Sequence, residues 1–413
     1  MADPSTSPPL TRASVFEARE LIKGFVHHTP TLTNATLNRL ASTPRSEVEG
    51  AGEGRKPARP TIRLYFKCEN LQRIGAFKIR GAFHAIERLK MEPGWEEGGG
   101  RERGVVTHSS GNHAQALALA ARTNGIPAHI VMPSISAKPK IAATKGYGAN
   151  VVFSGSTSVE REAVVEKVIA QTGARLVPPY DHPDIVLGQG TLGLELQEDA
   201  RDIIAAAVNT NAKSSPSQSE NHGTVLPAEV GFRAPITTPR LPERKKSHPG
   251  LDAILAPCGG GGMLSGVALS CEGTGIRVFG CEPWFEGADD AKRGYESGRR
   301  VEAVSTLTVA DGLRTPVGVV PWDIIYTRRL VAGFYSVSED EIVAALRLIY
   351  ERFKMVVEPS SAVPLAVALY NEDFRAMVER EAGEEGWDVG IVVSGGNVSL
   401  EALGRLFAPK DEE

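Results

Sequence analysis

Four consecutive glycines, Gly259 to Gly262, stand between two apolar stretches of the chain. Residues 251–256 (LDAILA) have the composition of a buried strand, and Met263 begins a segment with helical character. Glycine lets a backbone come close to a ligand, and a helix N-terminus after such a loop adds positive potential. The segment therefore predicts an anion cradle suited to a phosphate. A flexible turn is the alternative.

Strands and helices are predicted to alternate along the chain. Strand-like runs lie at 62–67, 104–107, 128–132, 251–256, 277–281 and 388–393, and helical spacing lies at 80–90, 112–123, 159–172 and 338–354. Alternation of this kind indicates an α/β protein with mostly parallel sheets. The glycine segment matches neither a Walker A loop nor GxGxxG followed by an acidic residue, so neither ATP nor NAD is its first expected ligand.

Composition excludes several classes of protein. Lys+Arg is 46 and Asp+Glu is 50, a net charge of −4, which argues against nucleic-acid binding through overall charge. The chain has no apolar run of about 18 residues, so no membrane span is expected. Four cysteines in 413 residues are too few for a disulfide scaffold. We expect a reducing, cytoplasmic location.

Three segments look like additions to a compact fold, and of these residues 41–60 are expected to be a surface loop without hydrophobic periodicity. Residues 1–12 are rich in serine and proline and lack the apolar core of a secretory signal, so a disordered tail is predicted. Residues 209–250 carry six prolines, five serines and a basic run at 244–246, which predicts a flexible insertion. The basic run is either a solvated loop or a patch for a partner.

Special residues also stand at three other predicted strand–helix junctions, where open α/β sheets hold ligands. Lys78 lies in 75–81 (GAFKIRG), and burial there would lower the pKa of its amine and make it a better nucleophile. An ordinary surface lysine at a helix start is the alternative. Residues 107–115 (THSSGNHAQ) offer hydroxyls and N–H groups for a carboxylate, or caps for a helix. Ser394, in 393–397 (VSGGN), could face a ligand ring atom or form a tight turn.

Together these four motifs resemble the fold type II pyridoxal-phosphate enzymes. They most resemble the serine racemases and serine/threonine dehydratases, including the threo-3-hydroxyaspartate dehydratase branch. The resemblance implies a tryptophan synthase β-like α/β fold, with two open, twisted parallel-sheet lobes and the cofactor in the cleft. A small lobe is expected at 104–180. A large cofactor-binding lobe is expected at 13–103 plus 181–408, with 209–250 inserted in it.

The same resemblance assigns residues to pyridoxal 5′-phosphate. Lys78 would carry the cofactor, the glycine loop would hold its phosphate, and Asn112 would bind the ring hydroxyl. Ser394 would face the pyridine nitrogen, and a neutral serine there makes the ring a weaker electron sink, which favours elimination over transamination. The full cofactor set is Phe77, Lys78, Asn112, Gly259, Gly260, Gly261, Gly262, Met263, Glu358 and Ser394.

For the substrate, the resemblance places its carboxylate at Ser109, Asn112 and His113. Lys78 and Ser110 would be the catalytic residues on opposite faces of the cofactor, because inversion at Cα needs a base on each face. Serine is a poor acid and base near neutrality, so racemisation is expected to be slower than elimination. Arg161 would attract a second carboxylate, unless it is a solvated helix arginine.

A metal site is also implied. Residues 282–290 (EPWFEGADD) resemble a family segment, with two extra residues in the middle. Glu282, the carbonyl of Ala288 and Asp290 would bind Mg²⁺ or Ca²⁺ through oxygen. An acidic surface loop is the alternative.

The resemblance thus predicts a dehydratase (ammonia-lyase) of L-serine, L-threonine or threo-3-hydroxyaspartate that also racemises serine, acting as a homodimer. Three alternatives stay open: a catabolic dehydratase without racemase activity, a β-replacement enzyme such as cysteine synthase, and a catalytically silent binding protein. Tyr180 stands where the racemases have asparagine, and Arg73 where some have a lysine that contacts ATP, which leaves nucleotide activation open.

Overall fold

The computed structural model describes residues 3–45, 56–109, 111–136, 138–213 and 250–408. These residues form a six-stranded sheet in the order β1-β2-β10-β7-β8-β9 and a four-stranded sheet in the order β5-β4-β3-β6. All neighbours are parallel except β1 and β2. The strands are β1 (Thr31–Leu32), β2 (Ile62–Cys68), β3 (Val105–His108), β4 (Ala128–Pro133), β5 (Asn150–Ser154), β6 (Arg175–Leu176), β7 (Ala253–Pro257), β8 (Arg277–Pro283), β9 (Gly333–Val337) and β10 (Trp387–Val393).

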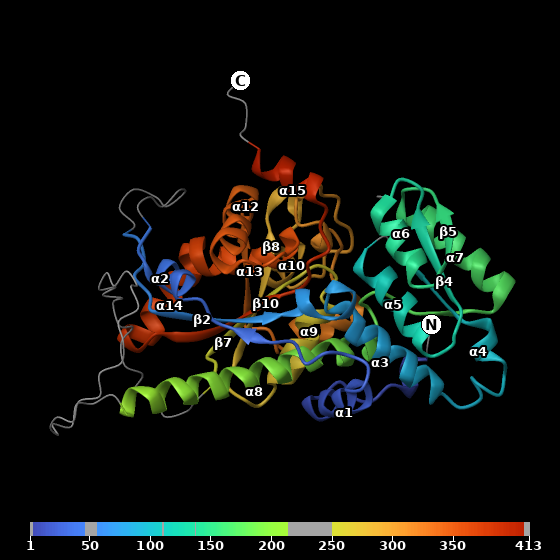
Figure 1. Ribbon diagram of the computed structural model, residues 1–413, viewed down its shortest axis with the longest axis horizontal. Helices are drawn as coiled ribbons and strands as arrows, with labels where there is room; N and C mark the ends of the chain where they lie inside the picture. Colours follow the sequence, from blue (N-terminus) through green and yellow to red (C-terminus); the bar gives the residue numbers. More distant parts are fainter. Residues whose placement is uncertain (1–2, 46–55, 110, 137, 214–249, 409–413) are drawn as a thin grey trace, which may run out of the picture.

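Helices cover both sheets (Figure 1). They are α1 (Arg12–Ile22), α2 (Ala35–Ser42), α3 (Lys78–Lys90), α4 (Gly100–Arg103), α5 (Asn112–Thr123), α6 (Lys138–Gly146), α7 (Ser158–Thr172), α8 (Pro183–Lys213), α9 (Gly262–Cys271), α10 (Asp290–Ser297), α11 (Val319–Trp322), α12 (Glu339–Leu348), α13 (Pro359–Tyr370), α14 (Glu372–Ala382) and α15 (Leu400–Phe407). Short 3-10 turns are η1 (Pro4–Thr6), η2 (Glu69–Leu71), η3 (Arg73–Gly75), η4 (Phe285–Gly287), η5 (Asp311–Leu313) and η8 (Gly383–Glu385), and η6 (Asp323–Thr327) and η7 (Ile349–Phe353) are π-helical.

The large sheet is buried on both faces. Every residue of β7 is buried, and successive side chains of a strand point to opposite faces. Leu255 accordingly joins the core cluster that contains α12 and α13, while Ile254 and Ala256 join the cluster that contains α8 and α9. Helices on both faces explain why β7 is a continuous apolar run.

The small sheet and its helices α5, α6 and α7 lie together at one end of the molecule (Figure 1). Its four strands all fall between residues 105 and 176. The apolar stripe predicted on 159–172 packs on this sheet, with Val165 and Val168 buried and Val164 and Ile169 half-buried. The exact boundaries of the two lobes stay a prediction.

Most predicted elements are present, and the differences have local causes. The predicted helix at 112–123 is α5, and Ser338 and Glu341 form the predicted capping box of α12. Residues 3–12, expected to be a disordered tail, contain the short turn η1, and Arg88 and Arg328 donate hydrogen bonds to carbonyls of this segment. Helix α8 extends to Lys213, inside the predicted insertion, and residues 214–249 lie outside the described residues. In the described chain, no helix has the length and apolarity needed to cross a membrane.

Candidate active site

Two segments far apart in the sequence are hydrogen-bonded to each other at the candidate site. The residues just before α3 lie against the loop after β10, where the Phe77 N–H donates to the Ser394 carbonyl at 3.0 Å and the Gly396 N–H donates to the Gly75 carbonyl at 2.9 Å. A β-bridge joins Ala76 to Gly395. The lysine motif and the C-terminal serine motif are therefore one structural unit.

Backbone strain marks this unit. Ile74 has a φ of +60°, a conformation that a β-branched residue rarely adopts. The next residue, Gly75, has a φ of +71°, and a Cβ there would lie 3.0 Å from Oδ1 of Asn397. Unusual backbone of this kind persists where surrounding structure fixes it, and it is common at functional sites.

Lys78 begins α3 and its Nζ donates to the Pro179 carbonyl at 2.7 Å. Burial lowers the pKa of this amine to about 8, and the nearby Glu358 carboxylate acts in the opposite direction. Its Nζ also lies 5.2 Å from the centre of the Phe77 ring. A large fraction of Lys78 is therefore neutral and nucleophilic at mildly alkaline pH.

Asn112, Glu358 and Asn397 form a hydrogen-bonded chain. The Asn112 Nδ2 donates to both Glu358 oxygens, at 3.2 and 3.0 Å, and the Asn397 Nδ2 donates to Asn112 Oδ1 at 2.8 Å. Burial raises the pKa of Glu358 to about 7, with Asp311 adding to the rise. The chain fixes the orientation of the Asn112 amide at the start of α5.

The four glycines pack closely against the protein. Gly259 to Gly262 are all buried, and a Cβ on Gly260 would lie 2.4 Å from the Tyr180 ring. Gly261 has a φ of +82°, and a Cβ there would lie 2.8 Å from Pro321. This loop is thus closely packed, which leaves no room for side chains at Gly260 and Gly261.

The same loop carries unsatisfied donors. Among the described residues, the N–H groups of Gly259 to Gly262 donate no hydrogen bond. Buried N–H groups without a partner are rare, and here they precede α9, whose N-terminus adds positive potential. This arrangement fits a phosphate group. Met263, the next residue, is buried in the core beside the loop.

Ser394 is buried and lies 3.0 Å, Oγ to Oγ, from Ser361. Ser361 also accepts a hydrogen bond from the Gly395 N–H at 2.9 Å. The side-chain partner of the Ser394 hydroxyl is therefore itself a neutral hydroxyl. Ser394 thus offers a neutral contact for a ring nitrogen.

The predicted substrate residues lie just after β3, in the first turn of α5 and on α7. Ser109 Oγ accepts from the Gly111 N–H at 3.3 Å, whereas Ser110 lies outside the described residues. His113 is buried, its Nε2 contacts the Val177 carbonyl at 3.2 Å, and its Nδ1 has no partner among the described residues. Burial lowers the pKa of His113 to about 3, so this ring is neutral. Burial lowers the pKa of His108 at the end of β3, and the positive charge of Arg161 lowers it further.

The predicted metal residues cluster at the end of β8. Glu282, Ala288 and Asp290 are all buried. Glu282 accepts hydrogen bonds from the Ala291 and Lys292 N–H groups, at 3.1 and 2.9 Å. Burial raises the pKa of Asp290 to about 7, and Asp290 Oδ1 has no partner among the described residues.

The carboxylates of Glu282 and Asp290, including the unpartnered Asp290 Oδ1, fit a cation that prefers oxygen ligands. Within the described ranges, no group of three or more His, Cys, Asp or Glu side chains could hold a metal. The predicted set has two carboxylates and one carbonyl.

Several residues of the site were not among the predicted ones. Asn397 and Ser361 stand in motifs (VSGGN and VEPSSAV) whose neighbouring residues were assigned, so the motifs themselves were the available signal. Lys140 and Asp311, an ion pair near Glu358, carry no such local signal.

Comparisons with known proteins show what the whole chain is similar to. Residues 52–212 and 242–395 match the family model described as "Pyridoxal-phosphate dependent enzyme". A serine racemase of Arabidopsis thaliana is 36% identical over 396 residues, which cover 95% of each chain. An L-threo-3-hydroxyaspartate ammonia-lyase of Saccharomyces cerevisiae is 34% identical, covering 97% of this chain and 98% of the relative. The crystal structure of serine racemase from Dictyostelium discoideum superposes with a TM-score of 0.69 at 35% identity, covering 94% of this chain and 99% of that one.

Proposed function

This chain belongs to the pyridoxal-phosphate dependent enzymes and has the fold type II architecture, and from that premise we propose that it is a serine racemase that also dehydrates β-hydroxy amino acids. The observation that carries the proposal is the position of Lys78, a buried lysine with a lowered pKa. Its amine contacts Pro179, and the next residue, Tyr180, packs on the glycine loop with the unsatisfied N–H groups. The similarity to serine racemases over nearly the whole chain supports it.

We propose the following residues as the binding set for pyridoxal phosphate. When bound, this cofactor supplies an aldehyde that links to amines and a ring that stabilises negative charge on the adjacent carbon. The N–H groups of Gly259 to Gly262 would receive its phosphate, Lys78 its aldehyde and Ser394 its ring nitrogen. Asn112, held by Glu358 and Asn397, would bind the ring hydroxyl beside Phe77.

Lys78 then acts as the base. Its neutral amine removes the Cα proton of one serine enantiomer. Ser110, which the family resemblance assigns to the opposite face, would return a proton to the same carbon and so yield the other enantiomer. Because a serine hydroxyl is a poor acid and base near neutrality, this route is the slower one.

In the faster route, the β-hydroxyl leaves as water after it takes up a proton. Water then adds to the remaining unsaturated amine and releases ammonia. L-serine thus gives pyruvate and ammonia, with one water lost and one gained. Ser109 and the neutral His113 would hold the substrate carboxylate at the start of α5.

L-threo-3-hydroxyaspartate is a second candidate substrate. The positive charge of Arg161 acts on the pKa of His108 at the end of β3. In our proposal, the same charge would attract the second carboxylate of this substrate. The similarity to the yeast ammonia-lyase supports this candidate.

We also propose a bound Mg²⁺ or Ca²⁺ at Glu282, Ala288 and Asp290, supported by the Asp290 oxygen that has no partner among the described residues.

A homodimer is proposed from the family resemblance. The four cysteines are free and buried, which supports a reducing compartment such as the cytoplasm.

A product assay tests the function. The purified protein is incubated with pyridoxal phosphate and Mg²⁺, and L-serine, L-threonine and L-threo-3-hydroxyaspartate are given separately. Chiral amino-acid analysis is run beside 2-oxo acid detection. D-serine together with pyruvate is the expected result. If a 2-oxo acid forms without D-serine, the protein is a dehydratase without racemase activity. If no substrate gives a product, the proposal is overturned in favour of a β-replacement enzyme or a binding protein.

A further inference from the structure

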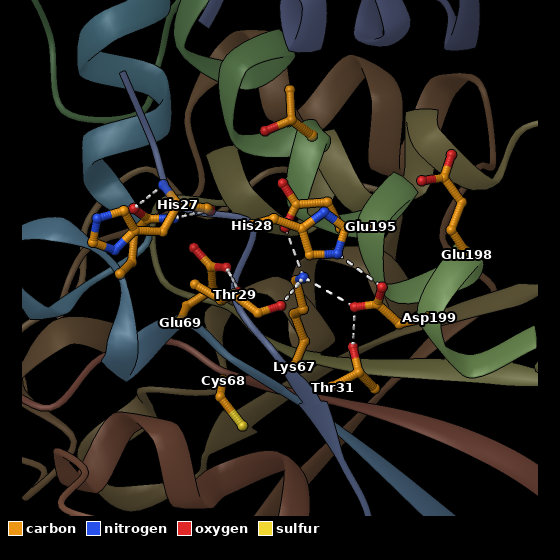
Figure 2. Close-up of polar contacts among 12 residues, drawn as sticks. His27, His28, Thr29, Thr31, Lys67, Cys68, Glu69, Glu195, Glu198 and Asp199 are labelled. Atoms are coloured by element: carbon orange, nitrogen blue, oxygen red, sulfur yellow. Dashed lines mark hydrogen bonds and ion pairs between the residues drawn. The ribbon is translucent and has the colours of Figure 1, made fainter. Parts of the chain in front are cut away.

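A largely buried cluster of charges lies on the side of α3 that Arg80 faces. Its cations are Lys67 and Arg80, both 0% exposed, and its anions are Glu69, Glu195 and Asp199. Figure 2 shows Lys67 between the Thr29 carbonyl, Glu195 and Asp199. None of these residues belongs to the proposed binding set, although Arg80 stands only two positions after Lys78.

Arg80 donates six hydrogen bonds in and around the cluster. It donates to Glu69 from Nε at 2.7 Å and from Nη2 at 2.8 Å, and to Glu195 from Nη1 at 2.7 Å and from Nη2 at 2.8 Å. Two further donations reach Thr191 Oγ1 and the His27 carbonyl, each at 3.2 Å. Two-fold contacts between a guanidinium and a carboxylate fix orientation as well as supplying energy.

Lys67 supports this arrangement from β2. Its Nζ lies 2.7 Å from the Glu195 Oε2, so Glu195 is shared by two cations. Burial acts to raise the pKa of Glu195, but Arg80 and Lys67 together keep it below its usual value. Glu195 thus stays ionised and continues to hold Arg80.

The first turn of α3 lacks the usual side-chain anchor. Its N-cap residue, Phe77, makes no side-chain capping hydrogen bond, although such a cap commonly fixes a helix start. Side chains two positions apart on a helix point about 200° apart, at roughly 100° per residue. Lys78 therefore points toward Pro179, while Arg80 points toward the carboxylates of Glu69 and Glu195 on another side of the helix.

We infer that Arg80 is a positioning residue for Lys78, because its carboxylate contacts anchor the uncapped first turn of α3 and so fix where the Lys78 amine lies. This inference rests on the proposed function, in which Lys78 carries the cofactor. Arg80 itself touches neither substrate nor cofactor.

Arg80→Lys tests the inference, because it keeps the charge and removes the forked contacts. With Lys78 displaced, the pH midpoint of the bound cofactor's visible absorbance is expected to move by about one unit. Turnover, kcat, is expected to fall by about tenfold to a hundredfold, with KM changed by less than about twofold. Arg375→Lys is the matched control, since Arg375 is also 0% exposed and paired with a carboxylate, Glu372.

Melting temperatures are measured for both variants beside the absorbance titration. The inference holds if both lose stability and only Arg80→Lys changes the titration. An Arg80→Lys protein with the wild-type titration and kcat would overturn it. If Arg80→Lys does not fold, Glu69→Gln decides by the same titration, a shift supporting the inference and an unchanged midpoint overturning it. The titration needs no turnover, so it remains informative if the wild-type protein fails the product assay.

Discussion

The Lys140 Nζ lies 2.9 Å from the Asp311 Oδ2, so an ion pair joins α6, beside the small sheet, to η5, beside the glycine loop. Lys140 and Asp311 are 34% and 45% exposed, and a pair at this level of exposure contributes little to stability. Its place is more informative, because both charges act on the pKa of Glu358 and Gly312, the residue after Asp311, packs on Gly259.

This pair is expected to affect turnover more than stability. Lys140→Asp places two carboxylates side by side between the two sheets and should lower kcat/KM for L-serine about fivefold, the equivalent of ~1 kcal/mol. The double variant Lys140→Asp with Asp311→Lys should recover most of the loss. Arg347→Asp is the control, since Arg347 pairs with Glu351 within one helical segment. A swap that restores nothing would contradict the role of the pair.

Ser110 and Lys78 should separate the two reactions. Ser110→Ala is expected to lose racemisation and to keep dehydration of L-serine, because Lys78 alone would remove the Cα proton of L-serine. Lys78→Ala should lose both. D-serine and pyruvate are measured in the same samples, and equal loss of both products in Ser110→Ala would reject the two-base mechanism.

The lowered pKa of Lys78 predicts how cofactor uptake depends on pH. Only the neutral amine attacks an aldehyde, so the uptake rate should rise with pH and level off above about 8. An ordinary lysine would keep accelerating to above about pH 10. Stopped-flow absorbance of cofactor-free protein measures this rate. Glu358→Gln removes a charge that raises the Lys78 pKa, so its plateau should begin at lower pH, and a plateau at the same or higher pH would contradict an electrostatic effect of Glu358 on Lys78.

Gly260→Ala should damage both stability and cofactor binding. The added Cβ would lie 2.4 Å from the Tyr180 ring, and overpacking of this kind costs about 1–3 kcal/mol of unfolding free energy. The displaced N–H groups should also weaken binding of pyridoxal phosphate. Thermal unfolding and fluorescence titration check the two effects. Gly404→Ala, in open space on α15, should be neutral or stabilising; a similar effect at both positions would argue against a packed cradle.

The proposed cation should stabilise the protein. Mg²⁺ or Ca²⁺ at about a hundred times its dissociation constant would add about 2.7 kcal/mol, and chelation should reverse the gain in melting temperature. Asp290→Asn should abolish this shift. Asp289→Asn is the control, because Asp289 is paired with Arg293 outside the proposed set, and loss of the shift in both variants would count against the assigned ligands.

The motifs at the ends of strands could be found in the sequence because each is a short run of neighbouring residues. Four glycines between apolar runs predict a phosphate contact without any knowledge of distant residues, whereas the lysine motif gains its meaning only from the resemblance that the four motifs carry together. The fold class followed from the same alternation, and α5 and the capping box of α12 match their predicted positions.

What could not be predicted depends on distant or disfavoured arrangements. Lys140 and Asp311 are 171 positions apart and pair only after the two sheets are placed. Arg80 and Glu195 lie on helices, where charged residues are usually solvated, so their burial has no sequence signal. The left-handed backbone of Ile74 runs against the preference of its own side chain.

The place of β10 has a consequence for synthesis of the protein. β10 lies between β2 and β7 and pairs with both, although it is made more than 300 residues after β2. While the ribosome is still adding the preceding helices, β2 and β7 each present an unpaired edge, and such edges are templates for association with other chains. A nascent chain stalled before Trp387 should therefore be a substrate for chaperones, and release of the last strand should be the step that closes the large sheet.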